Sequence, residues 1–343
     1  MHMAKQIFLD DFNGPSLDTT KWSVVRGKLD TENGTQMRFS GKNVSVVRNN
    51  VLNLAGTVAT GADMAQAPFL SGMVRTHNPD NGQVRFKAKG QFVVSIRSMS
   101  SKAPSSWPRI RLIGTKGDWP ACGEIDILEA KGWLYNNYWM NVHNPRAGEP
   151  TNSQQHQATI TENIARTSRY AHYDYSYTYS VAKLNDRIDF YLNNTLVHTV
   201  KYSEMDDPTP FTDPENGWII ELSHMIGGSF LDSGGTEEGH DEYVDATKYK
   251  EKYPSSMEVD YVRVISLDEP GTVDAMKDHV NIAGKYAHVT TSPEPPVIVP
   301  PTPDPPVVVP PTPEQEPAPE PAPKQRAKND WVREEDCLVF IML

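Results

Sequence analysis

Short runs of alternating apolar and polar residues, separated by polar turns, recur between residues 5 and 265. A period of two is the pattern of a strand with one buried face, and many short strands with polar turns are typical of an all-β sandwich. Long amphipathic helices are missing, and one short helix is expected at 274–285. A hairpin is expected at 186–194, because Asn193 and Asn194 tolerate the positive φ of a tight turn. Strands are expected at 44–47, 51–54, 83–89, 92–96, 187–192, 195–200, 218–222 and 257–265.

One further strand-like run carries three acids within six residues, separated by β-branched and aliphatic residues. Glu124 and Asp126 share one face of such a strand, because side chains alternate. Simple alternation would send Glu129 to the other face. One extra residue, forming a β-bulge around 127–128, restores the parity and predicts that all three acids lie on the same side.

Three acids on one face of an apolar strand repel one another, which raises the pKa of at least one of them. Glycoside hydrolysis with retention needs such a set, because it uses one ionised nucleophile and one protonated acid. The alternative is an edge strand with a solvated acidic face. The flanking residues Ile125, Ile127 and Leu128 have the character of core residues and argue against that alternative.

This run, Trp-Pro-Ala-Cys-Gly-Glu-Ile-Asp-Ile-Leu-Glu, resembles the active-site strand of glycoside hydrolase family sixteen. The bulged spacing is similar to the laminarinase branch and to the agarase, porphyranase and carrageenase branches, whereas lichenases have the unbulged spacing. Other segments that resemble the family follow in the same order along most of 5–265. They are 8–14 with Leu17, Asp18 and Trp22, then 71–76, 107–108, 141–143, 226–228 and 259–264.

The resemblance implies a jelly-roll β-sandwich of concanavalin type with an open cleft across its concave sheet. It also implies that Glu124 is the nucleophile, that Glu129 is the general acid/base and that Asp126 tunes the pair. No cofactor is expected for the chemistry.

Trp107, Arg109 and Arg111 alternate, so they share a face of a strand expected beside the acids. In the family that face stacks sugars, and the third of these positions is commonly Trp. Two guanidiniums facing a cleft could bind a sulfate or carboxylate of the substrate. Alternatively they pair with the catalytic acids or with neighbouring acids of the protein.

The resemblance suggests further substrate-binding residues. Trp119 is expected to stack on a sugar near the cleavage point, and Asn33 and Arg75 match positions that hydrogen-bond sugars on the non-reducing side. His143 matches a strand position beside the acids. Ser223 departs from the family, which often carries Asn there.

The resemblance also implies a structural calcium site on the convex face. Asp260 matches its side-chain ligand, and the carbonyls of Asp11 and Asn50 match its backbone ligands. Oxygen-only ligation suits calcium.

Composition divides the chain further. We expect the jelly-roll domain at 1–268, a connecting segment at 269–291, a proline-rich linker at 292–328 and a short apolar-ended tail at 329–343. Two near-copies of a ten-residue proline-rich unit favour a stiff polyproline II spacer, which indicates either a tether to a protein partner or a disordered tail.

The net charge of −11 makes nucleic acid an improbable partner. Cys122 and Cys337 lie in such different contexts that neither a disulfide nor a zinc site is expected. No apolar run approaches the length of ~20 residues that a membrane span needs. We expect a monomeric catalytic domain. The first residues carry no apolar signal region, so both a removed secretion signal and release by cell lysis, as for a phage-encoded depolymerase, are left open.

Together these features predict an endo-acting retaining glycoside hydrolase of a β-linked polysaccharide, with β-1,3-glucan of the laminarin type as the substrate. The alternatives are a sulfated or neutral galactan substrate, transglycosylation by the same residues, and a carbohydrate-binding jelly roll without catalysis.

Overall fold

The computed structural model describes residues 3–27, 33–47, 50–78, 81–134, 137–160, 176–232, 241–271 and 273–274 of the 343-residue chain. The proline-rich segment, the apolar tail and nearly all of the helix expected at 274–285 lie outside these residues. Asp274 itself ends a strand, β19 (Val273–Asp274).

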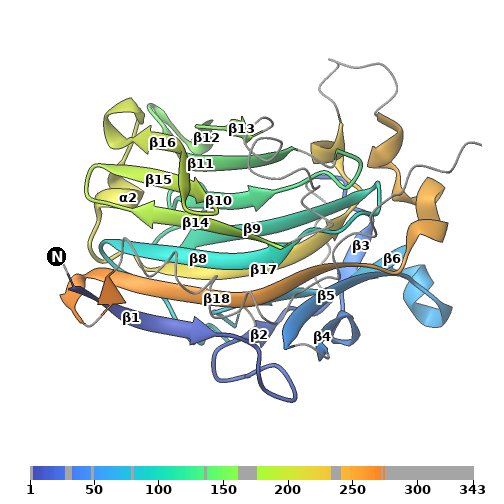
Figure 1. Ribbon diagram of the computed structural model, residues 1–343. Coiled ribbons are helices and arrows are strands. Elements are labelled where there is room, and N and C mark those ends of the chain that lie inside the picture. Colours follow the sequence, from blue (N-terminus) through green and yellow to red (C-terminus); the bar gives the residue numbers. More distant parts are fainter. Residues whose placement is uncertain are drawn as a thin grey trace, which may run out of the picture. The chain divides into compact units, whose positions relative to one another are not determined.

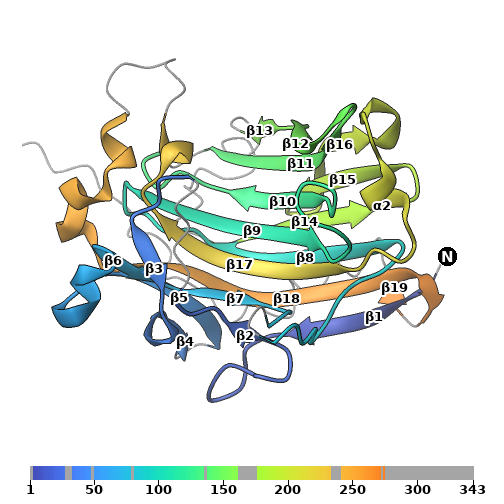
Figure 2. The same ribbon diagram turned by 180° about the vertical axis from the view of Figure 1, so that it is seen from behind.

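Two sheets pack face to face, the larger nearer the viewer in Figure 1 and the smaller in Figure 2. The strand order in the larger sheet is β16-β15-β14-β8-β18-β5-β6-β3, with β1, β19 and β4 paired alongside. In the smaller sheet it is β12-β11-β10-β9-β17-β7-β2, with β13 beside β11. Strand pairs are antiparallel except β3 with β6, which is parallel.

The remaining strands of the larger sheet are β1 (Met3–Asp10), β3 (Met37–Phe39), β4 (Val44–Val47), β5 (Val51–Val58), β6 (Phe69–Ser71), β8 (Phe92–Met99), β14 (Tyr177–Lys183), β15 (Arg187–Leu192), β16 (Thr195–Lys201) and β18 (Ser255–Pro270). The smaller sheet consists of β2 (Ser23–Val24), β7 (Met73–Arg75), β9 (Ser106–Gly114), β10 (Glu124–Glu129), β11 (Tyr138–Arg146), β12 (Glu149–Gln155), β13 (Ala158–Ile160) and β17 (Trp218–Ile226).

The main core lies between the two sheets. Leu54 and Val264 enter it from the larger sheet, and Ile110 and Leu222 enter it from the smaller sheet, all with no exposed surface. Full burial of one such side chain contributes roughly 1.5–3 kcal/mol. Side chains alternate along a strand. In the smaller sheet the polar residues between the core residues therefore point to the outer face of that sheet. That outer face carries the acids.

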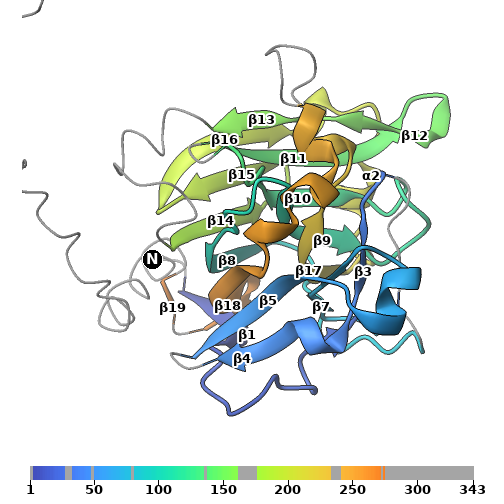
Figure 3. The same ribbon diagram turned by 90° about the vertical axis from the view of Figure 1, so that its right-hand side faces the viewer.

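Short helices lie between the strands, and Figure 3 shows the end of the sandwich at which η2, in light blue, and η5 and η6, in orange, gather. A second apolar cluster includes Trp107, Met225 and Leu231 together with Phe39 and Phe69 of the larger sheet. The described helices are η1 (Gly41–Asn43), η2 (Gly61–Ala65), η3 (Tyr202–Glu204), α2 (Thr209–Thr212), η4 (Ser229–Leu231), η5 (Asp241–Val244) and η6 (Ala246–Lys252). Within the described part of the chain, no helix has the length and apolarity to span a membrane.

The all-β sandwich predicted from the alternation is confirmed, and seven of the eight expected strands fall within observed ones. The expected hairpin is also present, since Asn193 and Asn194 join β15 to β16 with φ of 44° and 72°. The strand expected at 83–89 is wrong. That segment makes isolated bridges from Val84 and Ala88, because the amides of Arg85 and Phe86 both donate to the Thr76 carbonyl in place of a ladder.

Candidate active site

The three acids lie on β10, an inner strand of the smaller sheet between β11 and β9, with a bulge between the second and the third. On the neighbouring β9, Asp126 faces Arg111 and Leu128 faces Ile110, so β10 has one more residue than its partner. The register with β11 shifts over the same residues. The extra residue allows Leu128 and its predecessor both to enter the core while Glu129 returns to the outer face. The predicted bulge is confirmed.

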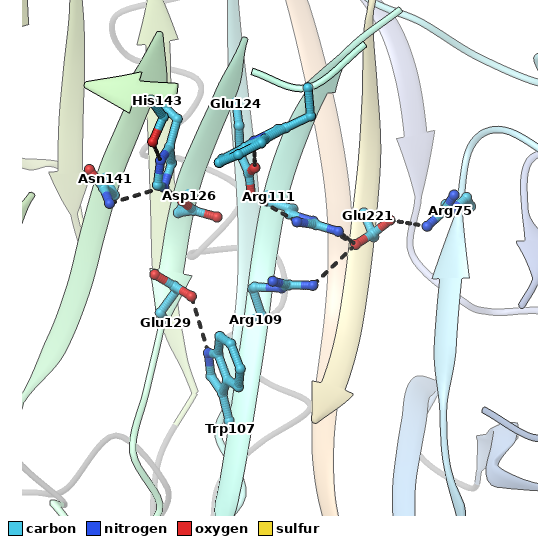
Figure 4. A network of polar contacts seen from close by, with 12 residues as sticks. Arg75, Trp107, Arg109, Arg111, Glu124, Asp126, Glu129, Asn141, His143 and Glu221 are labelled. Carbon is cyan, nitrogen blue, oxygen red and sulfur yellow. Dashed lines mark hydrogen bonds and ion pairs between the residues drawn. The ribbon is translucent and has the colours of Figure 1, made fainter. Parts of the chain in front are cut away.

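The register with the two neighbouring strands places polar partners beside each acid. Glu124 faces His143 on β11, Asp126 faces Asn141, and Glu129 faces Trp139. Figure 4 shows the acids on one side of the sheet, with the arginines of β9 next to them. The sequence-predicted residues that this face brings together are Arg75, Trp107, Arg109, Arg111, Trp119, Glu124, Asp126, Glu129 and His143.

Both oxygens of Glu124 accept hydrogen bonds. Arg111 Nη1 lies 2.8 Å from Oε1, and Trp119 Nε1 lies 2.7 Å from Oε2. Burial by itself raises the pKa of this carboxyl, but Arg111 and Arg109 outweigh it and lower the pKa to about 2. Glu124 is therefore ionised at neutral pH.

Glu129 has the opposite electrostatic environment. Its Oε1 accepts a hydrogen bond of 3.1 Å from Trp107 Nε1. Burial and the nearby carboxyl of Asp126 raise the pKa of Glu129 to about 8, although Arg109 acts against them. Glu129 is therefore protonated at neutral pH.

Asp126 lies between the two glutamates and contacts a histidine. Its Oδ2 is 3.2 Å from His143 Nε2, and among the described residues its Oδ1 has no hydrogen-bond partner. Burial and the charge of Glu124 raise the pKa of Asp126 well above its usual range, and burial lowers the pKa of His143. Both shifts favour the uncharged forms, so this contact joins two neutral groups and is not an ion pair.

Glu221 on β17 is a residue that the sequence analysis did not identify. Its carboxylate is 1% exposed and pairs with Arg75 at 2.5 Å, with Arg111 at 2.5 Å and with Arg109 at 3.7 Å. Burial opposes its ionisation, but Arg111 and Arg75 lower its pKa to about 2. The sequence held one signal that could have identified Glu221. It is an acid inside an apolar strand, and it lies two residues before Ser223 and so on the same face.

No family model matches the chain. Two curated proteins resemble it at low identity. A glucan endo-1,3-beta-glucosidase A1 of Niallia circulans is 24% identical over 271 residues, which are 75% of this chain and 37% of that protein. A keratan-sulfate endo-1,4-beta-galactosidase of Sphingobacterium multivorum is 26% identical over 277 residues, which are 76% of this chain and 55% of that protein. The aligned part thus spans about a third to about half the length of these relatives.

Solved structures share the fold. An endo-beta-1,3-glucanase from Pyrococcus furiosus superposes with a TM-score of 0.59 at 20% identity, covering 77% of this chain and 94% of that one. The laminarinase catalytic domain from Thermotoga petrophila has a TM-score of 0.60 at 19% identity, with coverage of 78% and 100%. SCLam, a non-specific endo-beta-1,3(4)-glucanase from family GH16, has a TM-score of 0.58 at 22% identity, with coverage of 78% and 93%. At these identities the likeness shows the fold alone. The predicted jelly-roll class is confirmed.

The substrate-binding residues that the family resemblance suggested differ in exposure. Trp119 is 51% exposed, and its ring lies 5.8 Å from that of His143, so it can stack on a sugar beside Glu124. Trp107 is only 3% exposed, because Phe230 stacks on it at 4.7 Å. Trp107 can therefore orient Glu129 but offers little surface for stacking. Asn33 lies apart from the acids in the described contacts, and its carbonyl accepts a hydrogen bond from the amide of Ser229.

A tract of half-buried aromatic residues continues from Glu129 towards η4 and η5. Trp139 meets Phe230 edge-on at 5.6 Å, and Trp133 stacks on Tyr243 at 5.4 Å. The ammonium group of Lys131 lies over Trp139, Phe230 and Trp133 at 4.9, 5.1 and 5.7 Å. Such rings suit sugar faces, and the buried ammonium fixes their mutual positions.

The calcium site that the family resemblance implied stays a prediction, and one contact of its expected side-chain ligand weighs against it. The carboxylate of Asp260, its expected side-chain ligand, is paired with Arg97, with 2.8 Å between Oδ2 and Nε. The guanidinium already supplies the positive charge that a calcium ion would bring. A calcium ion held by the carbonyls of Asp11 and Asn50 would have to compete with this guanidinium for the charged ligand.

Proposed function

We propose that this protein is an endo-acting retaining glycoside hydrolase that cleaves a β-linked polysaccharide by double displacement, with β-1,3-glucan of the laminarin type as substrate. The observation that carries the proposal is the division of ionisation on β10. The pKa of Glu124 is about 2 and that of Glu129 is about 8, on one face of one strand. At neutral pH the pair supplies one anionic nucleophile and one proton donor, which double displacement needs.

In the first step Glu124 attacks the anomeric carbon, and Glu129 gives its proton to the departing glycosidic oxygen. A covalent glycosyl ester on Glu124 results. In the second step Glu129, now a carboxylate, takes a proton from water as the water attacks the same carbon, and Glu124 is released. Each carboxylate oxygen of Glu124 accepts one hydrogen bond in the structure and keeps a further lone pair for the attack.

The neutral pair of Asp126 and His143 supports this cycle. After the first step Glu129 carries a negative charge inside a buried site, and a protonated Asp126 avoids a second fixed negative charge next to it. Asp126 is thereby a tuning residue, and His143 holds it in place.

The β-1,3-glucan assignment rests on the glucanase relative and on the glucanases among the structural neighbours. The test is incubation of the protein with laminarin, lichenan, agarose, porphyran, carrageenan and keratan sulfate, with release of reducing ends as the readout. The proposal expects release from laminarin and none from the Glu124→Gln protein. Equal release by both proteins would contradict it.

A galactan substrate is the second candidate, favoured by Arg111 at the commonly tryptophan position and by the keratan-sulfate galactosidase relative. The contacts of Arg111 weigh against it, because both Glu124 and Glu221 already neutralise this guanidinium. Substitution of Arg111 would disturb Glu124 whatever the substrate, so it cannot separate the candidates. Salt can: cleavage of a sulfated polymer through exposed cations should fall with ionic strength, whereas cleavage of a neutral glucan should not.

We also propose the division of labour expected from composition. Residues 1–268 carry the chemistry, 269–291 connect, 292–328 act as a spacer and 329–343 contact a partner protein. The sequence pattern of the spacer and the apolar end of the tail support this proposal.

A further inference from the structure

Glu221 is the anion around which the arginines of the outer face are arranged. It lies on β17 directly opposite Arg75 of β7 on one side and Arg111 of β9 on the other. Its Oε2 accepts a hydrogen bond from Arg75 Nη2. Its Oε1 accepts a hydrogen bond from Arg111 Nε and also lies 2.5 Å from Arg111 Nη2. Arg109, two residues before Arg111, reaches the same Oε1 at 3.7 Å. One buried carboxylate thus holds three guanidiniums from two strands.

The same contacts connect Glu221 to the acids. Arg111 uses Nη1 for Glu124 and its other two nitrogens for Glu221, so its position at the nucleophile is fixed from both sides. Arg109 faces Glu129 across the β9–β10 pair. Buried arginines are costly unless anions pair with them, and Glu124 alone cannot pair with three.

We propose that Glu221 is a positioning residue for catalysis, which holds Arg109 and Arg111 beside the acids and keeps Glu129 protonated by balancing their charge. In the resting site three guanidiniums face two carboxylates, Glu221 and Glu124. Without the Glu221 charge, the same guanidiniums would face Glu124 alone. The site would then favour ionisation of a further acid, and Glu129, which Arg109 already pulls towards the charged form, lies within reach.

The charge of the site also depends on the other ionisable groups around Glu221. Those nearest it are the arginines of β7 and β9, and beyond them lie the acids of β10 and the histidine of β11. They are Arg75, Arg109, Arg111, Glu124, Asp126, Glu129 and His143.

The test is the pH dependence of kcat in three variants of the full chain, and this readout rests on the proposed glycosidase activity. In Glu221→Gln the alkaline limb should move to lower pH by about one unit or more, the usual effect of one uncompensated nearby charge. Glu221→Asp keeps the charge and should leave the limb close to the wild-type position. Arg75→Gln removes a cation that contacts Glu221 and none of the acids of β10, so the limb should move to higher pH.

Restoration by a second substitution separates charge balance from mere structural support. Arg75→Gln combined with Glu221→Gln restores the excess of one positive charge, so the limb should return towards the wild-type pH. If kcat falls equally at every pH in Glu221→Gln and the double variant restores nothing, Glu221 is only structural. If Glu221→Gln does not fold, the upward shift in Arg75→Gln still decides, and its absence overturns the proposal.

A titration that needs no substrate distinguishes this proposal from the proposed function. Carbon-13 NMR of glutamate side-chain carboxyls follows the Glu129 resonance, assigned by its loss in Glu129→Gln, through pH 4–10. Its midpoint should fall in Glu221→Gln and rise in Arg75→Gln. An unmoved midpoint overturns the role of Glu221 even in an active enzyme, whereas a moved midpoint supports it even if every polysaccharide is left intact.

Discussion

Glu124 and Glu129 have identical side chains and lie on one short strand, yet their surroundings give them opposite protonation states. Both are buried, so desolvation acts on each towards the neutral form. The difference comes from the neighbours. Glu124 touches the Arg111 guanidinium, whereas Glu129 receives a neutral indole hydrogen bond and lies near Asp126. A charged partner reverses the effect of burial, and a neutral partner does not.

Glu124→Gln should reduce turnover to the background level and leave oligosaccharide binding within a few-fold. The amide cannot form the covalent intermediate, whereas the binding surface around Trp119 is unchanged. Isothermal titration with laminari-oligosaccharides, next to a reducing-end assay, measures both quantities. Turnover close to wild type would remove Glu124 from the mechanism.

Wild-type kcat/KM should be level through mildly acidic and neutral pH and fall above about 8. Glu124 must be ionised, which holds above about 2, and Glu129 must be protonated, which holds below about 8. The acidic limb of the kcat/KM profile lies near pH 2, where the folded state itself is expected to lose stability. The measurement is a pH profile in buffers of constant ionic strength.

In Glu129→Ala, substrates with good leaving groups should recover much of the lost rate, since they need no acid.

Glu129→Gln should raise the stability of the protein over wild type at alkaline pH. The gain should be smaller at acidic pH. The folded-state pKa of Glu129 is raised from 4.5 to about 8, so its contribution to stability is fully present below 4.5 and is lost as pH rises through 8. A glutamine has no proton to lose. The gain in Tm over wild type should therefore grow from pH 5 to pH 8. A constant difference across this range would mean that the pKa of Glu129 is not raised.

At the scale of the strand, the bulge in β10 lets one sequence place apolar side chains in the core and acids on the outer face. Ile125, Ile127 and Leu128 enter the core, while the three acids face outwards. The parity argument predicts this from sequence alone, because an odd spacing between like-facing residues requires an extra residue. The role of Glu221 could not be predicted in the same way. Its partners lie on β7 and β9, and cross-strand pairing over such separations is not encoded in local periodicity.

Deletion of Ile127 should keep Glu129 opposite Arg109, because the residue removed is the one without a partner on β9. The ladder would become regular, and the path along the strand between Asp126 and Glu129 would shorten by one residue, which changes the direction of the Glu129 carboxyl relative to Glu124. We expect a loss of stability of about 2–5 kcal/mol from the lost core side chain. Activity should fall much further than in Ile127→Ala, which loses most of that side chain but keeps the bulge. Denaturant unfolding and a laminarin assay compare the two, and equal activity would show that the bulge is dispensable.

At the scale of the molecule, the sandwich could be predicted because it depends on repeated alternation. Each expected strand between Val44 and Val47, or between Arg187 and Leu192, follows the period-two pattern locally. The segment 83–89 has the same pattern and is not a strand, because only isolated bridges hold it. The contact that weighs against the calcium expectation is likewise invisible to local pattern. Arg97 comes from the neighbouring strand β8, and its pairing with Asp260 is a tertiary contact.

The chain shortened to residues 1–291 should keep the activity and Tm of the full chain on soluble oligosaccharides. The described core and every catalytic candidate lie within these residues, and the first compact unit of the chain ends at Thr291. Differential scanning calorimetry and a reducing-end assay compare the two lengths. A large loss in Tm would show that the proline-rich part contributes to the folded domain.

The most direct test of the central claim, that Glu124 and Glu129 act by double displacement, is proton NMR of the first products of laminarin cleavage. Two displacements at the anomeric carbon restore its configuration. The β-anomer of the new reducing end should therefore appear first, and the α-anomer should follow only by mutarotation. An initial α-anomer would contradict the account, because it requires a single inverting attack by water and leaves Glu124 without its role.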